Sequence, residues 1–166
     1  SEIKEIYGAE VKTYDDAHRF LISKINENRN QNEKSIPSVL LSHCFINNGK
    51  VSESERSLSI GGSDRIGWET LQDFDYVALG HLHSPQTIGE KNHIRYSGSL
   101  LKYSFSESKQ EKSVVLVEIG EDGFVSAENL IYRPKRNVRK IKGKLQDIIE
   151  KGKNDPFKDD FIFCFL

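Results

Sequence analysis

Three of the five histidines follow short apolar runs of the chain, where imidazole chemistry is expected. His43 comes directly after the run 39–42, and His81 and His83 come after the run 75–80 in the segment Gly-His-Leu-His. Ligand sites of open α/β sheets form just beyond the carboxyl ends of strands. Neutral imidazole binds Zn, Mn, Fe or Co. The pattern therefore predicts a metal site made by these three side chains.

The spacing of the second pair has a geometric reason. Side chains at positions i and i+2 of an extended segment point the same way, so His81 and His83 could each reach one of two metal ions about 3.5–4 Å apart. Gly80 allows the backbone to turn sharply off the strand. The alternative is that these imidazoles are ordinary core or surface groups whose nitrogens bond backbone carbonyls.

That alternative is preferred for the two other histidines. His18 lies on an expected helix beside Arg19, and His93 begins an expected strand after a charged turn. Cys44 adjoins His43, but adjacent residues of a strand face opposite ways. Cys44 is therefore expected in the core and not in a zinc site.

The expected secondary structure places the histidines on a sheet. The run 38–42 is short and apolar, which is typical of a strand covered on both faces, and 75–80 is expected to be a second buried strand that ends in Gly. A helix is expected over 14–28, with a capping-box start at Thr13, followed by a polar loop over 26–35. A second loop is expected over 46–64 and a helical turn over 68–71. Further strands are expected over 94–97, 101–104, 113–118, 124–126 and 161–166, with a hairpin turn at 121–123 and a helix over 145–151.

Composition excludes several classes of protein. The net charge of −1 on 166 residues excludes a globally basic nucleic-acid coat. The two cysteines lack metal spacing and are too few for a disulfide scaffold, which favours the cytoplasm. No apolar run approaches the ~20 residues of a membrane span. Because the chain stops in an apolar run, we expect a fragment of a longer protein.

The segment 133–144 carries seven basic residues and no acid. Such a cluster could contact phosphates, with Arg136, Arg139 and Lys140 as candidate nucleic-acid-binding residues. The alternative is a solvated linker at a domain edge. The change of character places a domain boundary near Arg133, dividing the chain into 1–132 and 133–166.

The chain resembles the SbcD-type nuclease subunits of bacteria, which belong to the calcineurin-like metallophosphoesterases. The resemblance runs from about Ile36 to the C-terminus. It is carried by the segments 41–43, 52–56, 61–63, 74–86, 95–99 and 103–107. Gly-His-x-His alone would indicate only the superfamily, whereas Tyr-Ser-Gly-Ser followed by Tyr-Ser-Phe-Ser-Glu makes the resemblance specific.

The resemblance implies an α/β fold, part of an α/β/β/α metallophosphoesterase sandwich. Residues 1–132 would be the C-terminal half of the nuclease domain, and 133–166 would begin a small α+β capping domain. In the superfamily pattern, His43 and His81 would bind one metal ion and His83 a second, with manganese as the usual metal. The intact subunit would be a homodimer that cuts DNA with an SbcC-like ATPase. It would act in the cytoplasm, at the nucleoid, on double-strand ends and hairpins during repair, recombination and replication.

The resemblance also implies that the site is incomplete. The superfamily uses five blocks, of which only the lone His and Gly-His-x-His are recognised here. No Asp-x-His, no Gly-Asn-His and no strand-terminal Gly-Asp is recognised before His43, so the bridging Asp, the Asn ligand and the acid-like His are expected to be absent from this chain. We therefore expect no catalytic residue in this chain and no activity of the chain alone. Two alternatives remain: another metallophosphoesterase, acting on phosphoproteins or nucleotides, or a non-catalytic module that binds DNA or a partner through 133–144.

Overall fold

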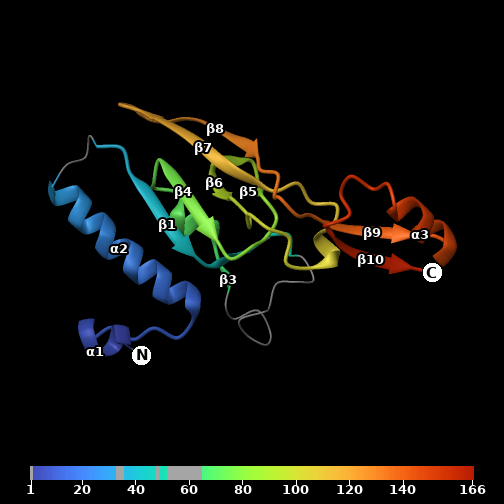
Figure 1. Ribbon diagram of the computed structural model, residues 1–166. Coiled ribbons are helices and arrows are strands. Elements are labelled where there is room, and N and C mark those ends of the chain that lie inside the picture. The colour runs from blue at the N-terminus through green and yellow to red at the C-terminus, as the bar shows by residue number, and fades with distance from the viewer. Residues whose placement is uncertain (1, 33–35, 48, 52–64) are drawn as a thin grey trace.

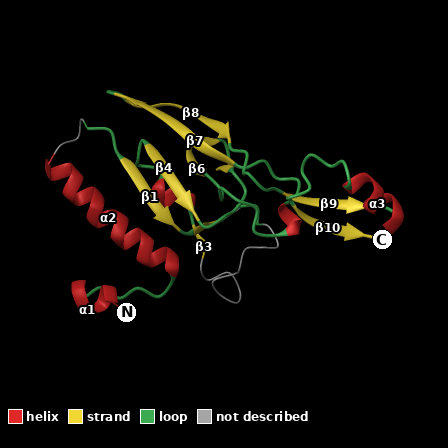
Figure 2. Ribbon diagram, viewed as in Figure 1, coloured by secondary structure: helices red, strands yellow, loops and turns green. Residues whose placement is uncertain are grey.

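The computed structural model describes residues 2–32, 36–47, 49–51 and 65–166. The segments 52–56 and 61–63 of the resemblance lie outside the described residues. The described chain is a mixture of helices and sheets (Figures 1 and 2), which confirms the predicted α/β class. Among the described residues, no helix combines the length and the apolar composition that crossing a membrane requires.

The central sheet has four strands in the order β1-β4-β6-β5. Strands β1, β4 and β6 are parallel, and β5 joins antiparallel to β6. Because parallel strands end at the same edge of a sheet, residues after β1 and after β4 lie close together. The strands are β1 (Val39–His43), β4 (Tyr76–Gly80), β5 (Gln86–Ile88) and β6 (Lys91–Tyr96).

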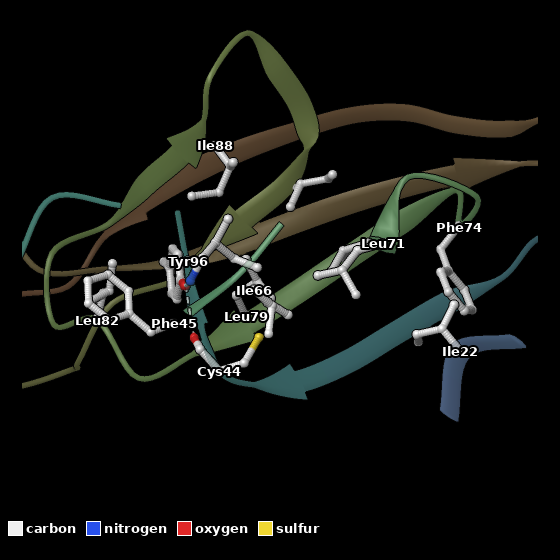
Figure 3. Close-up of a cluster of buried hydrophobic side chains, with 13 residues drawn as sticks. Ile22, Cys44, Phe45, Ile66, Leu71, Phe74, Leu79, Leu82, Ile88 and Tyr96 are labelled. Carbon is white, nitrogen blue, oxygen red and sulfur yellow. Dashed lines mark hydrogen bonds between the residues drawn. The ribbon is translucent and has the colours of Figure 1, made fainter. Parts of the chain in front are cut away.

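Three short elements follow the first strand. Strands β2 (Phe45–Ile46) and β3 (Arg65–Ile66) form a small parallel pair, and the 3₁₀ helix η1 (Trp68–Leu71) comes next, where a helical turn is expected. Their apolar side chains join the main core. Figure 3 shows this core, in which Cys44 and Phe45 lie among side chains of the central sheet.

Two helices precede the sheet, α1 (Glu2–Tyr7) and α2 (Tyr14–Asn32). The capping box is confirmed: Asp16 N–H donates to Thr13 Oγ1, and Thr13 N–H donates to Asp16 Oδ2, both at 3.0 Å. The loop expected over 26–35 is wrong in its first part, since the helix continues to Asn32. Arg29 explains the extension, because its guanidinium donates to Ser38 Oγ at 2.6 Å and lies over the Phe74 ring.

Strand β1 is covered on one face only, contrary to the expectation for this run. Its residues alternate between exposed and half-buried, and Leu41 is 77% exposed. The reason is topological: β1 is an edge strand, and the segment 113–131, which covers this face of the sheet, contacts β4 and β6. An apolar strand face is therefore left open beside the histidines.

A hairpin of β7 (Ser113–Gly120) and β8 (Gly123–Ile131) lies beside the central sheet in Figure 1, against the face opposite the main core. The predicted turn at 121–123 is confirmed. Phe124 stacks on Tyr76 with ring centroids 5.9 Å apart, and Arg95 donates to the Ala127 carbonyl oxygen. The strand expected over 101–104 is wrong, because this segment is irregular and leads into the 3₁₀ helix η2 (Phe105–Glu107).

A separate two-stranded parallel sheet ends the chain. It pairs β9 (Val138–Lys142) with β10 (Phe161–Phe165), joined by α3 (Leu145–Gly152). The helix and the last strand agree with expectation, but β9 lies inside the stretch interpreted as a linker. That part of the interpretation is wrong, because the apolar strand β10 offers 138–142 a pairing partner. Phe105 and Phe163 link this unit to η2, with ring centroids 5.2 Å apart.

Candidate metal site

His43 ends β1 directly opposite Gly80, the last residue of β4. A Cβ atom on residue 80 would lie 2.8 Å from His43 Nδ1, so any larger residue would force the ring to shift. The expected reason for Gly80, a sharp turn at this residue, is wrong. The glycine is needed for the close approach of an imidazole from the neighbouring strand.

The sharp backbone turn occurs one residue later, at His81. It has φ = 113° and is the only non-glycine residue of the described chain with positive φ. Such a conformation costs about 1–3 kcal/mol and is found preferentially at functional sites. It brings the His81 ring edge-on to His43, with centroids 5.5 Å apart, and next to Phe45 at 5.6 Å.

His83 has different neighbours. Its Nδ1 lies 3.0 Å from Glu107 Oε1, and its ring centroid is 5.3 Å from that of Tyr103. Glu107 is the last residue of η2 and of the Tyr-Ser-Phe-Ser-Glu segment of the resemblance. The function of this segment is thus to carry a carboxylate to the third histidine.

The Glu107 carboxylate is completely buried, and so is its counter-ion. Lys112 Nζ lies 2.7 Å from Glu107 Oε2, and the two side chains are 1% and 0% exposed. A buried carboxylate is tolerated only when it is paired and hydrogen-bonded. Lys112 meets that need, and its ammonium also donates to the carbonyl oxygen of His83 at 2.9 Å and to Ser99 Oγ at 2.9 Å. Sequence reasoning missed both residues, which are ordinary charged side chains in the sequence.

The loop between β6 and η2 packs against the main chain of His83. Ser99 N–H donates to the His83 carbonyl oxygen at 3.0 Å. Gly98 has φ = 78°, and a Cβ atom there would lie 2.8 Å from the same oxygen and from Pro85. The glycine in the segment 95–99 of the resemblance is therefore explained by this close packing.

Tyr96 fixes the segment that follows His43. Its phenol is fully buried, donates to the Cys44 carbonyl oxygen at 2.8 Å and accepts from Ile46 N–H at 2.9 Å. Cys44 itself is in the core, as expected, and burial raises the pKa of its thiol.

The three candidate histidines thus have two sets of neighbours. His43 and His81 are together, and His83 lies with Glu107. No group of three or more His, Cys, Asp or Glu side chains able to hold a metal ion occurs among the described residues. The donors nevertheless fit divalent metals: all three are imidazoles, and the hydrogen bond between a ring nitrogen and a buried carboxylate is typical of histidine ligands.

The other histidines have structural neighbours. Asp16-Ala17-His18 has the Asp-x-His spacing of a metallophosphoesterase block, which sequence reasoning overlooked. It lies inside α2, where Asp16 caps the helix and His18 Nδ1 contacts the Tyr14 carbonyl oxygen at 2.9 Å. His93 lies within β6 beside Phe124. Neither residue lies at the end of a parallel strand.

The three candidate nucleic-acid-binding cations differ in their surroundings. Arg139 forms ion pairs of 2.7 Å with Asp155 and Asp160 and donates to the Phe157 carbonyl oxygen. These carboxylates raise the pKa of the guanidinium, and their negative charges offset its positive charge. Arg136 and Lys140 are exposed. DNA contact by the three residues stays a prediction, to which Arg139 adds little charge.

Comparison with known proteins identifies a curated relative of this chain. The chain is 34% identical, over 163 residues and 95% of its length, to the SbcD subunit of the nuclease SbcCD from Staphylococcus epidermidis. It spans 42% of the length of that relative. No family model matches the chain. The match confirms the resemblance to an SbcD-type subunit, and the matched length corresponds to a part of such a protein.

Proposed function

We propose that this chain is a segment of the nuclease subunit of an SbcCD-type complex. It comprises the C-terminal half of the nuclease domain, residues 1–132, and the start of a capping domain, residues 133–166. The observation that carries the proposal is the 34% identity over 95% of the chain. The positions of the histidines after parallel strands support it. A match to a nuclease favours this function over a phosphoprotein phosphatase or a non-catalytic binding module.

In this proposal the histidines are metal ligands. His43 and His81 bind one divalent ion, since their rings adjoin each other, and His83 binds a second. When bound, two divalent ions, proposed to be manganese, activate water and stabilise the charge that develops on a phosphodiester. Phe45 and Gly80 hold the first two rings in place, and Glu107 holds the third. The remaining ligands are supplied by parts of the intact protein outside the described residues.

The proposed substrate is DNA, cut at double-strand ends and hairpins together with an SbcC-like ATPase. The intact subunit is proposed to act as a homodimer in the cytoplasm, with the nucleoid, in repair, recombination and replication. The exposed cations Arg136 and Lys140 of the capping domain would contact the duplex backbone. Backbone contacts need positive charge and no base-reading geometry, so this binding would be independent of sequence.

A chimera tests the proposal. The 163 matched residues of the Staphylococcus epidermidis protein are replaced by those of this chain, and manganese-dependent cleavage of linear duplex DNA is measured. We expect cleavage by the chimera and its loss in the His81→Ala chimera, with the His18→Ala chimera as a matched control. A folded chimera without cleavage would contradict the proposal.

Metal binding by the 166-residue chain is a second, independent test. Three imidazoles cannot offset the charge of two divalent ions, and the Irving–Williams order disfavours manganese at nitrogen ligands. Without the remaining ligands of the intact protein, we therefore expect at most one Zn²⁺ or Ni²⁺ per chain in a calorimetric titration. His43, His81 and His83 would share this single ion, so both His43→Ala and His83→Ala should weaken its binding. Two sites per chain, or unchanged binding in the double variant, would contradict the assignment.

A further inference from the structure

The carboxylate beside the third histidine has a function that the ligand assignment leaves open. Glu107 Oε1 contacts His83 Nδ1 at 3.0 Å, while Glu107 Oε2 lies 2.7 Å from Lys112 Nζ. The carboxylate is 0% exposed and sits between an imidazole and an ammonium. The two oxygens of one side chain therefore serve two different partners.

The buried lysine keeps Glu107 in its acceptor form. A carboxylate in an apolar environment takes up a proton unless an opposite charge compensates it. Lys112 supplies that charge at hydrogen-bond distance, so Oε1 remains a pure acceptor. A pure acceptor at 3.0 Å requires a proton on the facing ring nitrogen. In the neutral imidazole this places the proton on Nδ1 and the lone pair on Nε2.

The same lysine also fixes the backbone of His83. Its ammonium donates to the His83 carbonyl oxygen, which accepts from Ser99 N–H as well. It further contacts Gln110 Oε1 at 2.8 Å. His83 is thus held at its ring through Glu107 and at its main chain through Lys112 and Ser99. A ring that is held at both ends loses little conformational entropy when it binds a ligand.

We propose that Glu107 is a positioning residue, which keeps the His83 proton on Nδ1 and thereby presents the Nε2 lone pair to a divalent metal ion, with Lys112 as its fixed counter-ion. This inference rests on the proposed function, because it takes His83 as a ligand. A carboxylate partner of this kind fixes ring orientation and raises ligand basicity, and its loss typically lowers metal affinity about 10–100-fold.

The first test is the tautomer of His83 in the 166-residue chain without metal. Long-range ¹H–¹⁵N spectra at about pH 8, where imidazole is neutral, distinguish the protonated ring nitrogen, and His83→Ala assigns the signal. In Glu107→Gln, Lys112 retains the amide oxygen and the NH₂ group faces Nδ1. We expect the proton to move to Nε2, whereas Glu111→Gln, an exposed control, leaves it on Nδ1.

A matched pair of variants covers the case in which Glu107→Gln does not fold. Both carry Lys112→Met, so neither buries an uncompensated charge. With Glu107→Gln, the amide oxygen can accept from Nδ1–H, and the wild-type tautomer is expected. With Glu107→Leu, no acceptor remains and the tautomer preference is lost. An Nδ1–H tautomer that persists in the leucine variant would overturn the inference.

Zn²⁺ titration of the same variants separates the two proposals. We expect about a 10–100-fold weaker affinity for Glu107→Gln and unchanged affinity for Glu111→Gln. Unchanged affinity in His83→Ala refutes the ligand assignment itself. Weaker binding in His83→Ala, together with a wild-type tautomer or affinity in folded Glu107→Gln, refutes only the positioning function of Glu107.

Discussion

Removal of one oxygen atom from Tyr96 should destabilise the segment that carries the first histidine. The Tyr96 phenol bridges the Cys44 carbonyl oxygen and Ile46 N–H, two main-chain groups just after β1. Tyr96→Phe keeps the aromatic ring and its packing. It leaves one buried acceptor and one buried donor without this partner.

The magnitude follows from burial. Cys44 and Ile46 are 1% and 0% exposed, so water cannot replace the phenol without opening the core. Each buried polar group that loses its partner costs about 1–3 kcal/mol. With partial relaxation of the two groups, we expect a loss of about 2–4 kcal/mol in the free energy of unfolding. That is a large share of the roughly 5–15 kcal/mol that stabilises a typical domain.

Urea unfolding followed by tryptophan fluorescence measures this loss. Tyr14→Phe is the control, because Tyr14 is half exposed at the start of α2. Exposed substitutions of this kind usually stay within about 0.5 kcal/mol. The reasoning is refuted if Tyr96→Phe, with an unchanged dependence on urea, differs from the control by less than about 0.5 kcal/mol.

Three further predictions concern the site and the basic segment. Gly80→Ala places a methyl group 2.8 Å from His43 Nδ1; we expect about 1–3 kcal/mol of destabilisation and weaker Zn²⁺ binding, measured by urea unfolding and calorimetry. The 166-residue chain with manganese should not nick plasmid DNA, and nicking that is lost in a variant lacking His43 would contradict this. Binding of duplex DNA should weaken with salt; neutralising Arg136 and Lys140 should lower the log–log salt slope by about two units, at roughly 0.9 per phosphate contact. An unchanged slope in filter binding would identify the segment as a solvated surface.

Much of the fold is predictable from local pattern. The runs that became β1 and β4, the capping box at Thr13 and the hairpin turn before Phe124 all depend on residues adjacent in sequence. Errors occurred where distant partners decide. Arg29 extends α2 through contacts with Ser38, and β9 exists because β10 pairs with it. Neither partner can be read from a window of sequence around the element.

The positions of the candidate histidines were predictable, whereas the residues that support them were not. Histidines after buried strands are a local signal, and the structure does place His43 beside His81. The pair of Glu107 and Lys112 has no such signal, because its importance comes from burial, which charged residues rarely show. One cue was available: a carboxylate and an ammonium five residues apart, the first of them inside the segment that makes the resemblance specific.

At His81, the residue that would give the more stable backbone differs from the residue that the proposed metal site needs. Glycine would adopt φ = 113° without a side-chain clash, and so a search for more stable variants should favour it there. The gain would remove the ring that adjoins His43. Directed evolution of this domain for heat resistance would therefore discard a proposed ligand early, unless metal binding is selected at the same time. Stability assays alone would report that loss as an improvement.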